Sequence, residues 1–293
     1  MSVQAREQPM ATPARLSARV SERLLVRLPI FLVLLLLAVT TVYPLIFLTL
    51  NAFKEKNEYY TNTFGLPRGL YVGNFRLLAE NFNIVGALLN SIFVTAVAVS
   101  LSILLAALAS FPLAKIDFGG QTALFRFIVA LLLIPGQVLL IPVYLLFSRF
   151  GLISSYLSVI LIYTAIALPF GIFFLTSSFR GIPSEIIESA RIDGASLPRV
   201  FASIVLPLGR PAITTLAVLS SLSMWNELLL GMMLLPDESK RLMTPTIALL
   251  LGRLITNQPL LMAALLISSL PTVLLLAMAS RNLIGGITLG FGR

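Results

Sequence analysis

The sequence has no cysteine and no histidine among its 293 residues. These absences exclude disulfides, thiolate and imidazole metal sites, cysteine or histidine nucleophiles, and the imidazole pH switch. Charged residues are also scarce: they make up 11% of the chain, whereas soluble domains contain about a quarter, and 58% of the residues are hydrophobic. This composition is typical of a membrane protein and leaves few of the groups that a soluble enzyme would use.

Six apolar stretches are long enough to cross a bilayer, which requires roughly 20 residues at a helical rise of 1.5 Å each. These stretches are residues 28–52, 86–112, 124–147, 153–179, 211–235 and 259–280. Because lipid offers the backbone no hydrogen-bond partners, each must be helical. The sequence therefore predicts an all-α membrane protein with six transmembrane helices in residues 28–293. The tail 1–27 precedes them, and its first 20 residues are polar and are interpreted as disordered or as a short surface helix.

The basic residues indicate the orientation of these spans. With the N-terminus inside, 13 of the 21 Lys and Arg residues lie in cytoplasmic segments and 8 lie in the outer loops. Both termini are thus predicted to be cytoplasmic. The segment 180–210 becomes a cytoplasmic loop, and 53–85 and 236–258 become extracytoplasmic loops. The net charge of +9 is spread over these short loops, so no nucleic-acid partner is predicted.

Two features of the spans predict how they pack. Small residues recur every four positions in the second span, at Ala98, Ser102, Ala106 and Ser110. Such a stripe favours a close helix–helix contact, although an incidental Ala/Ser-rich helix would show it too. The third span contains Pro135-Gly136-Gln137 and then Pro142, which predicts a kinked or locally open helix. Discontinuous helices of this kind often line transport pathways.

One carboxylate lies within a span, in Trp225-Asn226-Glu227. A carboxylate in lipid costs several kcal/mol, so Glu227 should face a cavity, water or a partner chain. Two interpretations remain open from the residues alone. Glu227 lines a pathway or binding site, or it makes a structural hydrogen bond near the outer end of its span.

The cytoplasmic loop predicts a short helix. Pro183 suits its first turn, Glu185 and Glu188 suit its positive end, and Gly194 suits its termination. Ile186, Ile187 and Ala190 fall on one side and would form an apolar patch exposed to the cytoplasm. Such a patch requires either the membrane surface or another protein.

The stretch Glu188-Ser189-Ala190-Arg191-Ile192-Asp193-Gly194 is followed by Phe201, Ile204 and Leu206-Pro207. It resembles the cytoplasmic coupling motif of ABC importer permeases. That motif consists of E-A-A, three further residues and G, followed about nine residues later by I-x-L-P. Ser189 replaces the usual central alanine. Further stretches that resemble the shorter, maltose-type permease subunit of carbohydrate importers are 132–144, 151–152, 224–227, 234–240 and 282–287.

The resemblance covers residues 28–293 and places the chain with the binding-protein-dependent transport inner membrane components. It implies the MetI-like permease fold and alternating access in a bacterial plasma membrane. It also implies that ATP and magnesium bind to two separate ATPase subunits. The absence of a G-x-x-x-x-G-K-[ST] loop from the chain agrees with this. The chain itself would be no enzyme and would bind no cofactor or metal. The other implied partners are a longer second permease, the lipid bilayer, and a substrate-binding protein that docks on the loops 53–85 and 236–258.

The resemblance also implies roles for individual residues. The residues expected to couple the chain to the ATPase are Glu185, Glu188, Ser189, Ala190, Arg191, Asp193 and Gly194. Candidates for lining a sugar path are Gln137, Tyr144, Trp225, Asn226 and Glu227, because sugars favour amides, hydroxyls and aromatic faces. The ending Gly290-Phe291-Gly292-Arg293 departs from many relatives, so the extreme C-terminus is given no role.

Two other classes of function compete with this interpretation. An ion-coupled secondary transporter would use Glu227 as its relay, but such carriers usually show repeats and several intramembrane charges. A membrane-embedded enzyme would need clustered catalytic groups, and the acidic residues here are scattered. Within the carbohydrate class, maltose, trehalose, glycerol phosphate and other polyols all fit the loop pattern.

Overall fold

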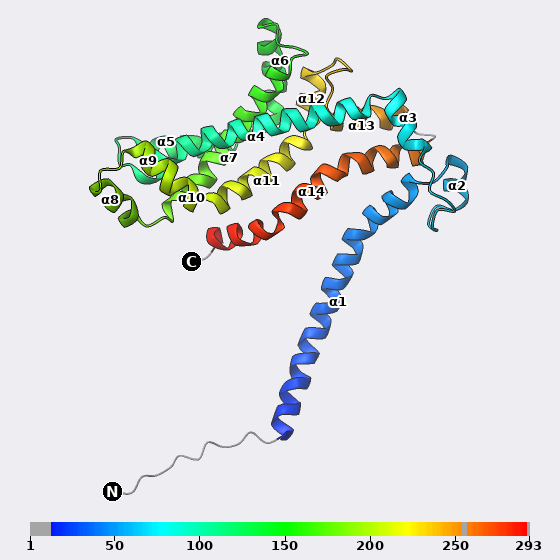
Figure 1. The fold of residues 1–293 in the computed structure, drawn as a ribbon, viewed down its shortest axis with the longest axis horizontal. Helices are drawn as coiled ribbons and strands as arrows, with labels where there is room; N and C mark the ends of the chain where they lie inside the picture. Colours follow the sequence, from blue (N-terminus) through cyan, green and yellow to red (C-terminus); the bar gives the residue numbers. More distant parts are fainter. Residues whose placement is uncertain (1–12, 254–256, 292–293) are drawn as a thin grey trace.

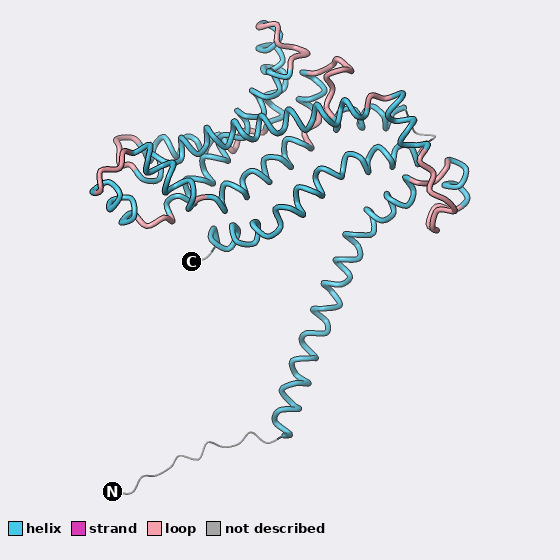
Figure 2. Tube along the Cα trace, viewed as in Figure 1, coloured by secondary structure: helices cyan, strands magenta, loops and turns pink. Residues whose placement is uncertain are grey.

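The computed structural model describes residues 13–253 and 257–291, and these residues form helices joined by short connections, with no strand (Figure 2). This confirms the all-α prediction. The helices are α1 Pro13–Ala52, α2 Lys56–Thr61, α3 Gly73–Asn81, α4 Ile84–Lys115, α5 Gln121–Leu131, the 3₁₀ turn η1 Gly136–Leu139, α6 Leu140–Arg149, α7 Tyr156–Arg180, α8 Ser184–Ile192, α9 Leu197–Val200, the π-helical turn η2 Phe201–Val205, α10 Leu206–Leu208, α11 Arg210–Trp225, α12 Leu229–Leu234, α13 Met243–Arg253 and α14 Gln258–Phe291.

Within the described residues, four helices are long and apolar enough to cross a membrane alone. They are Leu28–Ala52 of α1, all of α4, all of α7, and Gln258–Ala279 of α14. Two further candidates are bent pairs: α5 with η1–α6, bent by 85°, and the run Leu197–Leu208 with α11, bent by 73°. Six crossings result if each bent pair is one span, so the number six stays a prediction.

The third and fifth predicted spans are interrupted. The third stops at Leu131 and resumes at Gly136, and Pro135 between them has an extended backbone with ψ 129°. This confirms the predicted local opening. The fifth, predicted as 211–235, is divided at residues 226–228 into α11 and α12, a break that contains no proline.

α4 and α7 form the most extensive helix–helix contact of the bundle. The stripe Ala98, Ser102, Ala106 and Ser110 is 3% exposed or less, which confirms its predicted role as a packing surface. Two side chains bond across the contact: Ser110 Oγ donates to the carbonyl of Ile172 at 3.1 Å, and Thr164 Oγ1 donates to that of Ala98 at 3.4 Å. Small side chains permit this close approach of two backbones.

α1 extends away from the other helices and contacts mainly α14 (Figure 1). Its side chains from residue 28 to residue 46 are exposed, although they are almost all apolar. In a membrane this surface must be covered by lipid or by another chain. The predicted tail 1–27 is partly helical, because α1 begins at Pro13, and residues 1–12 lie outside the described residues.

Candidate functional site: a coupling helix, a membrane cavity and two outer loops

The predicted cytoplasmic helix is α8, and its two ends form as the sequence indicates. Pro183 has a backbone ψ of 131° and precedes the first turn. At the other end Gly194 has a φ of +85°, a conformation that glycine adopts without steric cost. The N–H of Gly194 donates to the carbonyl of Arg191 at 3.0 Å, and that of Ala195 donates to Ala190 at 2.9 Å. These two bonds make a Schellman motif and fix where α8 ends.

The inner face of α8 differs from the prediction. Ile187 is 6% exposed and Ala190 is half-buried, because both pack against Ile182, Val200 and Val205. The predicted apolar patch of Ile186, Ile187 and Ala190 is therefore wrong. The apolar side chains that face outward are Ile186, 42% exposed, and Ile192, 87% exposed.

The seven predicted coupling residues lie on this one short element. Ala190 is half-buried, and the other six, Glu185, Glu188, Ser189, Arg191, Asp193 and Gly194, are exposed. Ser189 Oγ donates to the carbonyl of Glu185 at 2.8 Å, so the residue that replaces the usual alanine is satisfied within the helix. The arrangement presents a mainly polar surface with acidic and basic side chains and two exposed isoleucines, Ile186 and Ile192.

Two basic residues that sequence analysis did not select join the C-terminal ends of α4 and α7, and one of them also bonds to the segment that leads into α8. The ammonium of Lys115, at the end of α4, donates to the carbonyls of Ile182 and, at 3.4 Å, Arg180. Arg180 in turn donates from Nη2 to the carbonyl of Leu113 at 3.4 Å, and its guanidinium lies 4.6 Å from the ring centre of Phe125. The sequence signal that could have identified Lys115 and Arg180 is their position at the C-terminal ends of helices, where basic side chains bond to free carbonyls.

Glu227 lies in the break between α11 and α12 and accepts three hydrogen bonds. The N–H groups of Leu230 and Gly231 donate to its two carboxylate oxygens at 3.0 Å each. The hydroxyl of Tyr163, on α7, donates to Oε2 at 3.1 Å. Glu227 thus satisfies the free amides at the start of α12, as an N-capping side chain does. Glu227 therefore makes the structural hydrogen bonds that one interpretation predicted, and its role in a pathway stays a prediction.

Glu227 also lines a cavity between α7 and α11 of about 280 Å³. Most of the lining is apolar, and the polar groups come from Glu227, Tyr163, Ser220 and Ser223. We call this space the Glu227 cavity. A largely apolar cavity with a few converging polar groups has the general character of a small-molecule site.

The five predicted path residues do not gather around that cavity. Trp225 lines a separate cavity of about 210 Å³ between α4, α11 and α14. Asn226 is exposed, and its amide donates back to the carbonyl of Leu222 at 2.8 Å. Gln137 and Tyr144 are exposed on η1 and α6 and line neither cavity. Of the five predicted path residues, only Glu227 lines the cavity between α7 and α11.

The first predicted extracytoplasmic loop is organised around a buried lysine. Lys54 is 0% exposed, and its ammonium donates to the carbonyls of Asn62 at 2.6 Å, Gly65 at 2.7 Å and Thr63 at 3.3 Å. Burial lowers the pKa of Lys54, and the nearby carboxylate of Glu58 opposes this effect. A charge this deeply buried must be satisfied, and here backbone oxygens satisfy it.

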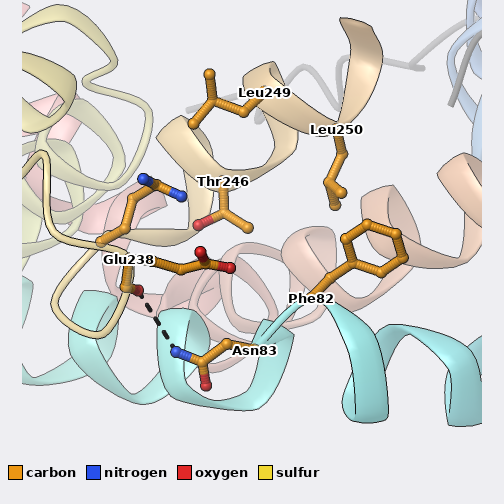
Figure 3. A pocket seen from close by; sticks show the side chains of 7 residues that line it. Phe82, Asn83, Glu238, Thr246, Leu249 and Leu250 are labelled. Atoms are coloured by element: carbon orange, nitrogen blue, oxygen red, sulfur yellow. Dashed lines mark hydrogen bonds between the residues drawn. The ribbon is translucent and has the colours of Figure 1, made fainter. Parts of the chain in front are cut away.

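The second predicted extracytoplasmic loop contains residues 235–242, between α12 and α13, which we call the outer loop. Hydrogen bonds from the N–H and hydroxyl of Ser239 lower the pKa of Asp237. A small pocket separates the loop from the start of α4, where Asn83 donates to the carbonyl of Glu238 at 3.5 Å (Figure 3). Its free space, about 20 Å³, is the size of one water.

Comparison with known proteins supports the same assignment for most of the chain. The model of the family "Binding-protein-dependent transport system inner membrane component" matches residues 98–287. Similar relatives include the diacetylchitobiose uptake system permease protein NgcG of Streptomyces coelicolor, 30% identical over 88% of this chain and 86% of its own length. Another is the arabinooligosaccharides transport system permease protein AraQ of Halalkalibacterium halodurans, 30% identical over 87% of this chain and 92% of its own.

A solved structure supports the fold. A chain of a bacterial alginate ABC transporter, crystallised with an alginate pentasaccharide-bound periplasmic protein, matches with a TM-score of 0.64 and 16% identity. The match covers 91% of this chain and 96% of that chain. The ion-coupled alternative finds no support in these comparisons. The chain belongs to the family of binding-protein-dependent transport inner membrane components, the permease subunits of ABC importers.

Proposed function

We propose that this chain is one of two permease subunits of an ABC importer that moves a sugar, an oligosaccharide or a similar polyol across the bacterial plasma membrane. Family membership supports the permease role, and the carbohydrate class is supported by relatives named for chitobiose and arabinooligosaccharide uptake. The chain itself would hydrolyse no ATP. Two ATPase subunits with bound ATP and magnesium would supply the energy, and a longer second permease would complete the pathway.

The observation that carries the proposal is the surface of α8. Its exposed residues Glu185, Glu188 and Arg191 offer charges, and Ile192 offers an apolar anchor, to a partner of matching shape. The Schellman motif fixes the end of the helix at Gly194, Lys115 bonds to Ile182 just before its start, and the buried Ile187 attaches its inner face to the bundle. A rigid helix that projects from a bundle can transmit the movement of a bound ATPase to the spans.

Site-specific crosslinking tests this proposal directly, because the chain has no native cysteine. Ile192→Cys should crosslink to an ATPase subunit in the assembled complex. Phe64→Cys, 81% exposed on the loop ordered by Lys54, is the matched control and should crosslink to the substrate-binding protein instead. An Ile192→Cys variant that reaches only extracytoplasmic protein would overturn both the orientation and the coupling role.

A substitution at Gly194 tests the geometry of the coupling helix. Gly194→Val places a β-branched side chain at a φ of +85°, which is strongly disfavoured, whereas asparagine tolerates this region. We expect Gly194→Val to reduce copurification of the ATPase and ATP hydrolysis by the complex, and Gly194→Asn to retain both. Normal assembly and hydrolysis with Gly194→Val would contradict the proposal.

For the substrate path we propose the Glu227 cavity, between a continuous helix, α7, and an interrupted one, α11. Alternating access requires a site near the middle of the membrane and helices that can change their relative position. Tyr163, Ser220, Ser223 and Glu227 supply hydroxyl and carboxylate groups that can bond to a sugar. Ser223→Leu should raise the sugar concentration needed for half-maximal uptake, and an unchanged value would remove this cavity from the path.

A further inference from the structure

The outer loop is attached to helices that are distant from it in sequence. The side-chain amide of Asn90, on α4, donates to the carbonyls of Ser239 at 3.0 Å and Arg241 at 3.1 Å. The hydroxyl of Tyr156, the first residue of α7, donates to Oδ1 of Asn90 at 2.8 Å. Both N–H groups and the oxygen of this amide are therefore used. Asn90 joins α4, α7 and the outer loop at one point.

Other contacts extend the attachment along the loop. Lys240 Nζ donates to the carbonyl of Ser154, just before α7, at 2.8 Å, and the N–H of Ser154 donates to the carbonyl of Leu234 at 2.8 Å. The N–H of Met243 donates to Ser91 Oγ, on α4, at 2.7 Å. The two residues that flank the outer loop are thus bonded as well, Leu234 to the segment before α7 and Met243 to α4.

The opposite ends of the same two helices are bonded to each other, and Lys115 is also bonded to Ile182, just before α8. Lys115 ends α4 and Arg180 ends α7, and their hydrogen bonds join Ile182, Arg180 and Leu113 as described above. In Figure 1, α8 lies near one end of α4. The helix that follows the outer loop, α13, lies near the opposite end of α4. At 1.5 Å per residue, the 25 residues from Asn90 to Lys115 separate the two regions by about 38 Å.

The two helices between these regions are continuous and closely packed. Neither α4 nor α7 is interrupted, and the stripe of small residues brings their backbones together from Ala98 to Ser110. The bonds of Ser110 and Thr164 cross the contact at two levels. A pair of this kind moves as one body, since sliding would break both bonds and the close packing.

We propose that Asn90 is the positioning residue that fastens the outer loop to the packed pair α4 and α7, so that movement of the outer loop passes through this pair to α8. The inference rests on the proposed function for the partners at each end. In this arrangement a protein that displaces the outer loop displaces α4 and α7 together, and the ends of both helices move the coupling helix. Coupling needs such a physically connected element between two sites.

Distance measurements between spin labels test the proposal. Glu238→Cys and Ile192→Cys are both exposed and place one label on the outer loop and one on α8. The complex is assembled with its ATPase subunits and measured without nucleotide and after trapping with ATP and vanadate. With Asn90 present, we expect the same interspin distance in both states. With Asn90→Leu, we expect a broader distribution that differs between the two states.

Two further variants keep the result interpretable. Asn90→Asp retains the acceptor for Tyr156 but loses both donors to the loop, so it should behave like Asn90→Leu even if the latter fails to fold. Asn83→Gly is the matched control, because it removes only the 3.5 Å bond to Glu238 and suits the φ of +44° at that position. It should leave the distance distribution unchanged.

The functional readout is ATP hydrolysis by the same preparations. Asn90→Asp should retain the basal rate and lose most of the stimulation by the copurifying substrate-binding protein. Unchanged distances and full stimulation in both Asn90 variants would overturn the inference while leaving the proposed function intact. A wild-type complex that contains no ATPase and hydrolyses no ATP would instead contradict the proposed function.

Discussion

Continuous and interrupted helices lie side by side in this bundle, and the comparison shows what decides between them. α7 contains Pro169 yet runs unbroken from Tyr156 to Arg180, whereas the fifth predicted span breaks at residues 226–228 without any proline. α7 packs along α4, which supports its backbone on both sides of the proline. At the other break, Glu227 satisfies the amides of α12. Tertiary contacts therefore determine continuity more than local sequence does.

The difference also divides the work of transport. The continuous pair α4 and α7 joins the segment before the coupling helix to the outer loop, and the Glu227 cavity lies between α7 and the interrupted fifth span. A rigid connection and a deformable pathway place opposite demands on packing. Substitutions that weaken one kind of helix should therefore have distinct effects from those that weaken the other.

The largest expected effect comes from separating the continuous pair. A Cβ at Gly171 would lie 3.0 Å from the Cβ of Ala106 and 3.5 Å from a methyl of Leu216. Gly171→Val should therefore destabilise the chain by about 1–3 kcal/mol, the usual range for overpacking. The measurement is thermal unfolding of the purified complex.

The matched control for this substitution lies beside the break of the third span. A Cβ at Gly136 has no atom within 4 Å, so Gly136→Val should change the unfolding temperature little. Equal losses of stability for the two variants would show that the α4–α7 contact is no more demanding than the interrupted helix.

A smaller effect is expected at the break of the fifth span. Glu227→Ala leaves the amides of Leu230 and Gly231 without their acceptor, and loss of a capping side chain typically costs about 1 kcal/mol. The amides of residues 229–231 should exchange hydrogen faster, while those of the α4–α7 contact keep their protection. Glu227→Gln retains one acceptor oxygen and should give an intermediate result. Unchanged exchange in Glu227→Ala would remove its capping role.

The sequence predicted those features that depend on local pattern or periodicity. The stripe from Ala98 to Ser110, the opening near Pro135 and the end of α8 at Gly194 are all confirmed, because spacing, proline chemistry and glycine's freedom at positive φ act within a few residues. The boundaries of α4 and α7 lie within three residues of the predicted spans.

Features that depend on distant partners could not be predicted in this way. Ile187 faces inward because Val200 and Val205 fold back over α8, and no local pattern indicates that. Asn90 and Lys115 act through backbone carbonyls of other segments, which leave no signature in side-chain identity. Glu227 was selected for its charge, but its role as a cap follows from a break that the sequence does not indicate.

The smallest expected effect concerns a hydrogen bond between α7 and the interrupted fifth span. The Tyr163 hydroxyl donates to Glu227 at 3.1 Å, and Tyr163→Phe removes it without opening a cavity. Hydrogen bonds between membrane helices contribute about 0.6 kcal/mol on average. A double-mutant cycle with Glu227→Gln, followed by thermal unfolding, should give a coupling of this order. If the two losses of stability are strictly additive, the hydrogen bond does not couple α7 to the break, and the continuous helix does not restrain that side of the Glu227 cavity.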